Sequence, residues 1–78
     1  MKNYIDISKN LANIIRLKRS ELNITQEKLA ETSSIDYKHI QNLESMKRIN
    51  DPRLSTLLKL AEALKINIDE LMKKIVEE

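Results

Sequence analysis

From residue 8 onward, the apolar residues of this 78-residue chain recur every three or four positions, the spacing of one face of an α-helix. Alternation typical of a strand is nearly absent, because only Ile5 and Ile7 show it. The pattern and its breaks predict helices over about 8–22, 26–32, 36–45, 52–64 and 67–78. We therefore expect an all-α fold, a compact five-helix domain spanning residues 1–78, with residues 1–7 as an N-terminal arm.

The breaks carry residues that cap helix ends, since a Ser, Thr or Asp side chain can accept a hydrogen bond from a free backbone N–H. The capping residues that we expect are Ser8, Thr25, Asp36 and Asp51. Pro52 follows in the first turn of its helix, where the missing N–H costs nothing. Residues 67–70, Asn-Ile-Asp-Glu, form a capping box in its Asn form and predict the start of the last helix.

Each predicted helix presents an apolar face to the core. The inward residues that we expect are Leu11, Ile14, Ile15 and Leu22 in the first helix, Leu29 in the second, Ile40 and Leu43 in the third, and Leu54, Leu57, Leu58, Ala61 and Leu64 in the fourth. The whole length of the chain is therefore accounted for by one small core.

The composition excludes most enzyme chemistry. The chain has no Gly, although average usage of roughly 7% would give about five. Phosphate-binding motifs built on glycine loops are therefore excluded. It also has no Cys and a single His, His39, which excludes thiolate zinc sites, Cys nucleophiles and His clusters. We expect no enzyme, no catalytic residue, no metal and no cofactor.

The charge is mixed, with 14 basic against 12 acidic residues and a net charge of +2. Residues 1–53 hold ten bases and seven acids, whereas residues 54–78 hold four and five. This imbalance is a weak indication that the N-terminal two-thirds contacts a polyanion. Apolar runs are too short to span a membrane, and residues 1–10 lack the apolar segment of a signal peptide. We therefore expect a cytoplasmic protein without membrane contact.

Residues 26–45 have the layout of a helix-turn-helix. Two short helices joined by a three- or four-residue turn pack at a steep angle, which requires a small residue at their closest approach. Ala30 occupies that position. The inward positions of the motif must be apolar, and they read Leu29, Ile35, Ile40 and Leu43.

The chain resembles the Cro and phage-repressor (XRE) class of helix-turn-helix domains over residues 9–72. The markers are Ile15-Arg16, Arg19, Thr25-Gln26, Leu29-Ala30-Glu31, Ile40, Leu43-Glu44, Pro52, Leu57-Leu58, Ala61, Ala63-Leu64 and Ile68-Asp69-Glu70-Leu71. The resemblance implies a lambda-repressor-like fold that binds double-stranded DNA. Small stand-alone members include phage-type repressors and controllers of restriction–modification genes, and the sequence does not choose between them.

The family often places Gly at three positions that here read Asn23, Ser34 and Met46. Asn tolerates positive φ well and Ser less so. We expect Asn23 to take the left-handed conformation after the first helix and Ser34 to make the central bend. The segment before Pro52 is one or two residues longer than the family's usual pattern.

In this motif the second helix enters the major groove of DNA and its outward residues contact the bases. The base-reading residues that we expect are Tyr37, Lys38, Gln41 and Asn42, with Asp36 and Ser45 also outward and His39 at the edge. We expect phosphate contacts from Lys47, Arg48 and Arg53. The resemblance adds Gln26 as a phosphate contact and Arg19 with Glu44 as a partly buried structural ion pair.

The C-terminal helix, residues 67–78, carries more apolar surface than one terminal helix needs. We expect a homodimer whose interface includes Ile68, Met72, Ile75 and Val76; the alternative is that these side chains only close the core. Two copies would place their recognition helices about 34 Å apart, on successive turns of a palindromic operator. The sequence therefore predicts a transcriptional regulator, with possible contact to RNA polymerase. The alternative is an antitoxin-like module that binds a toxin and has secondary DNA binding.

Overall fold

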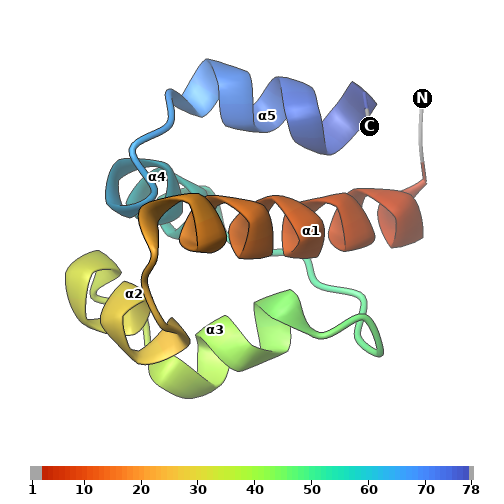
Figure 1. Ribbon diagram of the computed structural model, residues 1–78. Helices are drawn as coiled ribbons and strands as arrows, with labels where there is room; N and C mark the ends of the chain where they lie inside the picture. Colours follow the sequence, from red (N-terminus) through yellow and green to blue (C-terminus); the bar gives the residue numbers. More distant parts are fainter. Residues whose placement is uncertain (1–2, 78) are drawn as a thin grey trace.

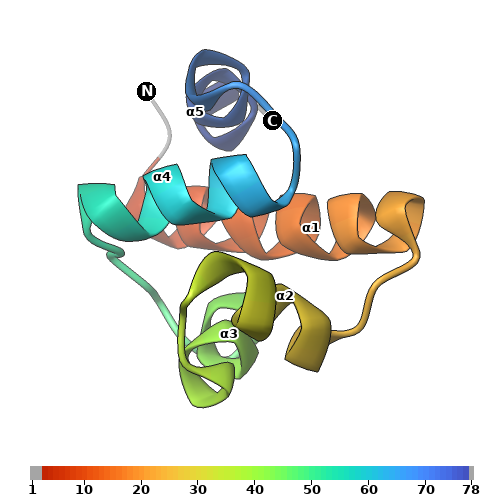
Figure 2. The ribbon, with the colours of Figure 1, turned by 90° about the vertical axis from the view of Figure 1, so that its left-hand side faces the viewer.

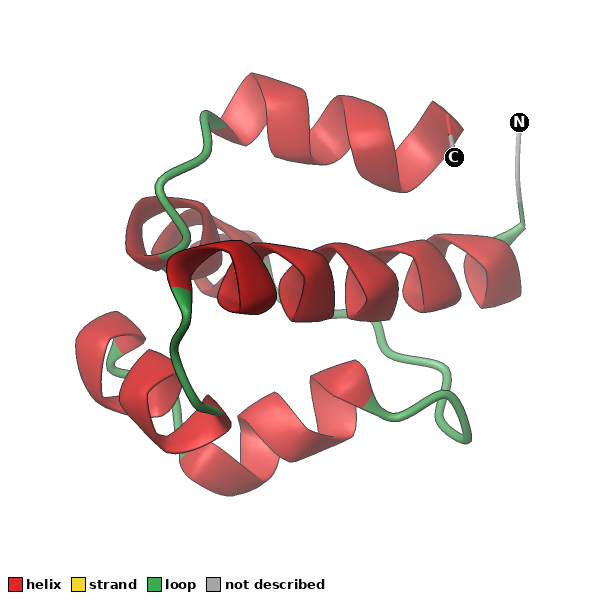
Figure 3. Cartoon of the chain, viewed as in Figure 1, coloured by secondary structure: helices red, strands yellow, loops and turns green. Residues whose placement is uncertain are grey.

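The computed structural model describes residues 3–77 and contains, within them, five α-helices and no strand (Figures 1 and 3). The helices are α1 (Tyr4–Leu22), α2 (Gln26–Ser33), α3 (Tyr37–Glu44), α4 (Leu54–Ala63) and α5 (Ile68–Glu77). The predicted all-α fold is confirmed. In this part of the chain, no helix is both long and apolar enough to cross a membrane.

The long helix α1 runs through the middle of the molecule. It packs against α5 on one side and against α3 on the other, while α2 packs against both α3 and α4 (Figures 1 and 2). The fourth helix lies beside α1 and also contacts α5 (Figure 2). The α2–α3 pair is therefore held at one face of the molecule, opposite α5.

One apolar core joins all five helices. It contains the expected inward residues of α1, α2 and α3, together with Leu57, Leu60, Ala61 and Leu64 of the α4 region and Leu71 of α5. The predicted apolar face of α4 is wrong in part, because Leu54 and Leu58 are exposed and Leu60 is buried instead. Leu22 is only partly buried and packs against the edge of the core.

The first helix begins four residues earlier than predicted. Asn3 caps it, since its side-chain Oδ1 accepts a hydrogen bond of 2.9 Å from the backbone N–H of Asp6. The prediction that Ser8 is a cap is wrong, because Ser8 lies inside α1 and is buried. Residues 4–7 are helical rather than part of an arm, and the expected arm residues 1 and 2 lie outside the described residues.

The other predicted caps have mixed outcomes. Thr25 caps α2 through a 3.0 Å hydrogen bond from the N–H of Lys28 to its Oγ1, as predicted. Asp36 occupies the N-cap position of α3, but within the described residues its side chain makes no capping hydrogen bond. The prediction for α4 is wrong: this helix begins at Leu54 after Arg53, so Asp51 does not cap it. The residues before α4 belong instead to a longer connecting segment.

Three residues between 3 and 77 have positive φ, and all lie just after a helix. Asn23 and Ser34, with φ of 57° and 59°, take the left-handed conformation as predicted. Lys65, with φ of 58°, was not foreseen. Each is followed by an Ile whose N–H returns to the preceding helix: Ile24 to Arg19, Ile35 to Ala30 and Ile66 to Ala61. The same left-handed residue followed by Ile therefore comes after α1, α2 and α4, and in each case the next helix begins two residues after the Ile.

Candidate nucleic-acid interface

The four predicted base-reading residues lie on the short helix α3. Ile40 and Leu43 are fully buried and anchor one face of this helix in the core. On the remaining surface, Tyr37 and Lys38 are exposed, and Gln41 and Asn42 are half-buried. Asp36 precedes the helix and is exposed, whereas Ser45 follows it and is half-buried. Helix α3 itself lies on the opposite side of α1 from α5 (Figure 1), and these residues make up its surface outside the core.

The α2–α3 turn sets the position of this helix. Ser34 takes the left-handed conformation and the next residue, Ile35, is buried in the core. Leu29 of α2 is also fully buried, and Ala30 packs against the same core. Gln26, the predicted phosphate contact, is the first residue of α2 and is half-buried. The predicted burial of the four inward residues of the motif is therefore confirmed.

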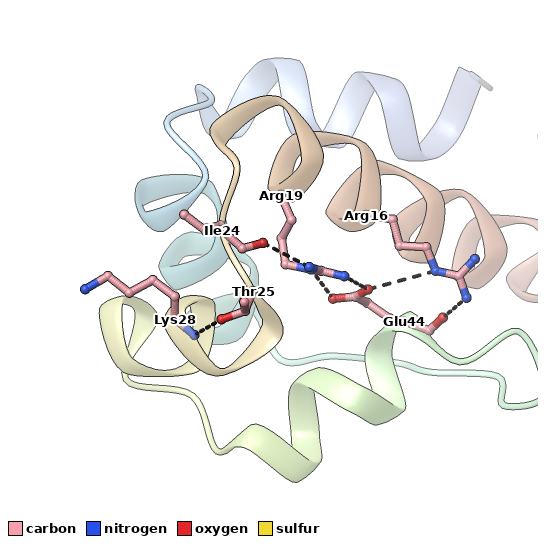
Figure 4. Close-up of polar contacts among 6 residues, drawn as sticks. All are labelled: Arg16, Arg19, Ile24, Thr25, Lys28 and Glu44. Carbon is pink, nitrogen blue, oxygen red and sulfur yellow. Dashed lines mark hydrogen bonds and ion pairs between the residues drawn. The ribbon is translucent and has the colours of Figure 1, made fainter.

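An ion pair joins α1 to the end of α3 (Figure 4). Arg19 donates through Nε and Nη2 to the two carboxylate oxygens of Glu44, both at 2.8 Å, and through Nη1 to the carbonyl oxygen of Ile24 at 3.0 Å. Glu44 is only 3% exposed. The hydrogen bond to Glu44 raises the pKa of the Arg19 guanidinium above its usual value, although partial burial opposes this shift. The expected pair of residues therefore meets in the structure.

A second arginine holds the same end of α3. Arg16 donates through Nη2 to the backbone carbonyl of Glu44 at 2.7 Å, and its Nε lies 3.9 Å from Oε1 of that residue (Figure 4). The bond satisfies a carbonyl at a helix C-terminus, where no intrahelical donor exists. The sequence marked Arg16 only through its resemblance to the family, with no contact predicted. Its position one turn before Arg19 on α1 is the signal that could have placed both on Glu44.

Basic residues without a carboxylate partner surround α3. Within residues 3–77, no ion pair forms to Lys38, Lys47, Arg48 or Arg53, and all four are exposed. By contrast, Lys18 and Lys28 on α1 and α2 pair with Glu residues three positions later, at 3.2 and 3.4 Å. These four basic side chains are therefore not held in close ion pairs, which leaves them available to an anionic partner.

The single histidine, His39, lies at the edge of this surface. It is half-buried and borders a shallow hollow whose other charged residues are Asp51, Arg53 and Lys59. Among the described residues, no group of three or more His, Asp or Glu side chains is placed to hold a metal ion.

The predicted dimer residues divide into two sets. Ile75 is 3% exposed and belongs to the core, so its assignment to an interface is wrong. Ile68 is half-buried and packs against the core. Met72 and Val76, each 37% exposed, border an apolar groove whose other lining residues include Tyr4, Ile7, Pro52 and Leu57. The exposed apolar surface of α5 is therefore smaller than the sequence suggested, and it is shared with α1 and the segment before α4.

Comparisons with known proteins agree with this geometry. The model of the helix-turn-helix family matches residues 15–71. Control protein C.SmaI of Serratia marcescens is 36% identical to this chain over 69 residues, which cover 88% of this chain and 80% of that protein. Both matches support a DNA-binding transcriptional regulator rather than an enzyme. The chain belongs to the XRE class of the helix-turn-helix family.

Proposed function

We propose that this protein binds a palindromic operator as a homodimer and controls transcription in a sequence-specific way. The observation that carries the proposal is the polar surface of α3, which is bordered by the unpaired cations Lys38, Lys47, Arg48 and Arg53. Similarity to control protein C.SmaI favours a controller of restriction–modification genes over a phage-type repressor.

In the proposed complex, α3 lies in the major groove. Lys38 donates to the O6 and N7 atoms of a guanine, and Gln41 or Asn42 pairs with an adenine through two hydrogen bonds. Tyr37 contacts a thymine methyl group or a phosphate. Each base contact of this kind gives about 1–3 kcal/mol of discrimination between bases. All of these side chains are on one helix, so one orientation of α3 in the groove allows them to contact the bases together.

Phosphate contacts fix this docking geometry. Lys47 and Arg48 lie in the segment after α3, and Arg53 is the N-cap residue of α4. Gln26 lies at the N-terminus of α2, where free backbone N–H groups favour an anion. Contacts of this kind fix the register and orientation of a protein on the duplex without reading its sequence.

The proposed dimer uses the apolar groove bordered by Tyr4, Met72 and Val76. A second copy of the chain is the occupant that fits the proposed operator, because a palindrome requires two recognition helices related by a two-fold axis. Small domains of this length also gain stability by association.

The DNA-binding proposal is tested with a fluorescent palindromic duplex from the region upstream of the gene. The dissociation constant is measured from 50 to 300 mM salt for the wild type, Arg53→Ala and the control Lys73→Ala, an exposed lysine on α5. We expect binding that weakens steeply with salt, and a shallower salt dependence only for Arg53→Ala. Absence of salt-sensitive binding at micromolar protein would overturn the proposal.

Sedimentation equilibrium tests the dimer separately. Val76→Glu places a charge in the apolar groove and should give a folded monomer, whereas Lys73→Glu on the exposed side of α5 should stay dimeric. If Val76→Glu sediments as a dimer, the interface lies elsewhere.

A further inference from the structure

Ser8 connects α1 to a segment 40 residues away. It is 3% exposed, and its hydroxyl accepts a hydrogen bond of 2.8 Å from the backbone N–H of Asn50. The same hydroxyl donates to the backbone carbonyl of Arg48 at 3.3 Å. One buried side chain on α1 thus holds two backbone groups of the segment between α3 and α4, residues 45–53, which we call the basic loop.

Asn50 ties the basic loop to α3 as well. Its side-chain Nδ2 donates to the backbone carbonyl of Asn42, one of the proposed base-reading residues, at 2.9 Å. Near the start of the loop, the N–H of Lys47 donates to Oγ of Ser45 at 3.2 Å. The path of the loop is therefore set against both α1 and α3.

Apolar burial contributes little to this path. Two large apolar residues of the basic loop, Met46 and Ile49, are 40% and 62% exposed. The loop also has no helix or strand of its own. The hydrogen bonds of Ser8 and Asn50 thus tie the basic loop, which carries Lys47 and Arg48, to α1 and α3.

We infer that Ser8 and Asn50 are positioning residues for DNA binding. They hold the basic loop in one conformation, so that Lys47 and Arg48 meet phosphates while α3 occupies the groove. A loop that is already ordered loses less conformational freedom on binding, and this raises affinity without adding a contact. The inference rests on the proposed DNA binding.

The test measures operator and random-duplex affinity for Ser8→Ala across a salt series. We expect affinity for both duplexes to fall about five- to tenfold, with their ratio unchanged, because phosphate contacts carry no base information. The slope of log affinity against log salt should become shallower by about one, the change expected when one phosphate contact is lost. Ser20→Ala, on an exposed part of α1, is the matched control and should bind like the wild type.

A double-mutant cycle separates positioning from general stability. In a Lys47→Ala, Arg48→Ala background, Ser8→Ala should lower affinity less than twofold, since the residues through which it acts are gone. An equal loss in both backgrounds would show a structural role only and overturn the inference.

If Ser8→Ala fails to fold, Asn50→Ala provides the test, because Asn50 is only half-buried and the substitution removes its side-chain bond to Asn42 while keeping its backbone bond to Ser8. Like Ser8→Ala, Asn50→Ala should lower the affinity for both duplexes and make the slope of log affinity against log salt shallower. If folded Asn50→Ala and Ser8→Ala both bind like the wild type, the inference is wrong. A wild type that does not bind DNA would instead overturn the proposed function.

Discussion

Helices α3 and α5 are built alike on their inner faces and differ on their outer faces. Each buries an aliphatic pair: Ile40 and Leu43 in α3, Leu71 and Ile75 in α5. The outer side of α3 carries polar groups and adjacent unpaired cations, whereas α5 exposes Met72 and Val76. The inner face shows only how a helix is held. The outer face indicates the partner, which we propose is DNA for α3 and a second copy for α5.

The two helices are also fastened differently. Besides its apolar anchors, α3 is held by the Arg19–Glu44 ion pair, which is largely removed from water. Helix α5 is joined to α1 by a neutral contact, a 2.9 Å hydrogen bond from Asn10 Nδ2 to the carbonyl of Ile75. A charged, geometrically specific contact thus holds the helix that we propose reads the bases.

The largest expected effect is the difference in stability between charged substitutions on the inner and outer faces of α5. Ile75→Glu places a carboxylate in the core and should lower the free energy of unfolding by at least about 3–5 kcal/mol. The neighbouring Val76→Glu should change it by less than about 0.5 kcal/mol relative to the monomer, because this side chain reaches solvent. Circular dichroism during urea unfolding measures both. Two variants of equal stability would contradict the assignment of the two faces.

A smaller effect tests how α3 is fastened. Arg19→Met keeps an apolar stem but leaves the carboxylate of Glu44 buried without its bidentate donor, so unfolding should become easier by about 2–3 kcal/mol. Lys28→Met removes the exposed ion pair with Glu31 at 3.4 Å and should cost less than about 1 kcal/mol. Chemical denaturation compares the two. A loss for Arg19→Met no larger than that for Lys28→Met would show that the ion pair does not hold α3.

The smallest expected effects concern the connections that lead into both helices. Ser34 precedes α3 and Lys65 precedes α5, each with positive φ. Replacing either with Gly should stabilise the protein by about 0.5–1 kcal/mol, since Gly adopts this conformation without a steric cost. Asn23→Gly should gain less, because Asn tolerates the conformation better. Thermal unfolding detects these shifts, and Ser20→Gly within α1 should instead destabilise by about 1 kcal/mol.

Local patterns in the sequence were sufficient to predict the inward residues of the helix-turn-helix. The spacing of Leu29, Ile35, Ile40 and Leu43 placed all four in the core, as the structure confirms. Thr25 was also found, because the side chain of a cap residue binds backbone only three positions later. These features depend on neighbours in sequence, and so they can be predicted from sequence.

Features that depend on distant partners could not be predicted in this way. Ser8 looked like a helix cap, but its hydroxyl binds residues 40 and 42 positions away, and Asn3 caps α1 instead. Lys65 has no preference for positive φ and gave no local signal. In hindsight, the repeated pattern of a polar residue, Ile and a second polar residue at 23–25, 34–36 and 65–67 marks the three connections.

Which face of α5 is buried is a second feature that could not be predicted from the sequence. Periodicity yields two apolar pairs on this helix, Leu71 with Ile75 and Met72 with Val76, that differ by one position. Only packing against α1 and α4 decides that the first pair turns inward. The sequence therefore predicted an amphipathic helix without fixing its rotation.

The most direct test of the central claim, that α3 reads DNA sequence, is the ratio of operator to random-duplex affinity at one salt concentration. Lys38→Ala and Asn42→Ala should each lower operator affinity about 5- to 150-fold, the equivalent of about 1–3 kcal/mol, and bring the ratio towards one. Arg53→Ala should weaken binding to both duplexes alike and leave the ratio unchanged. A wild-type ratio that survives in both Lys38→Ala and Asn42→Ala would contradict the account.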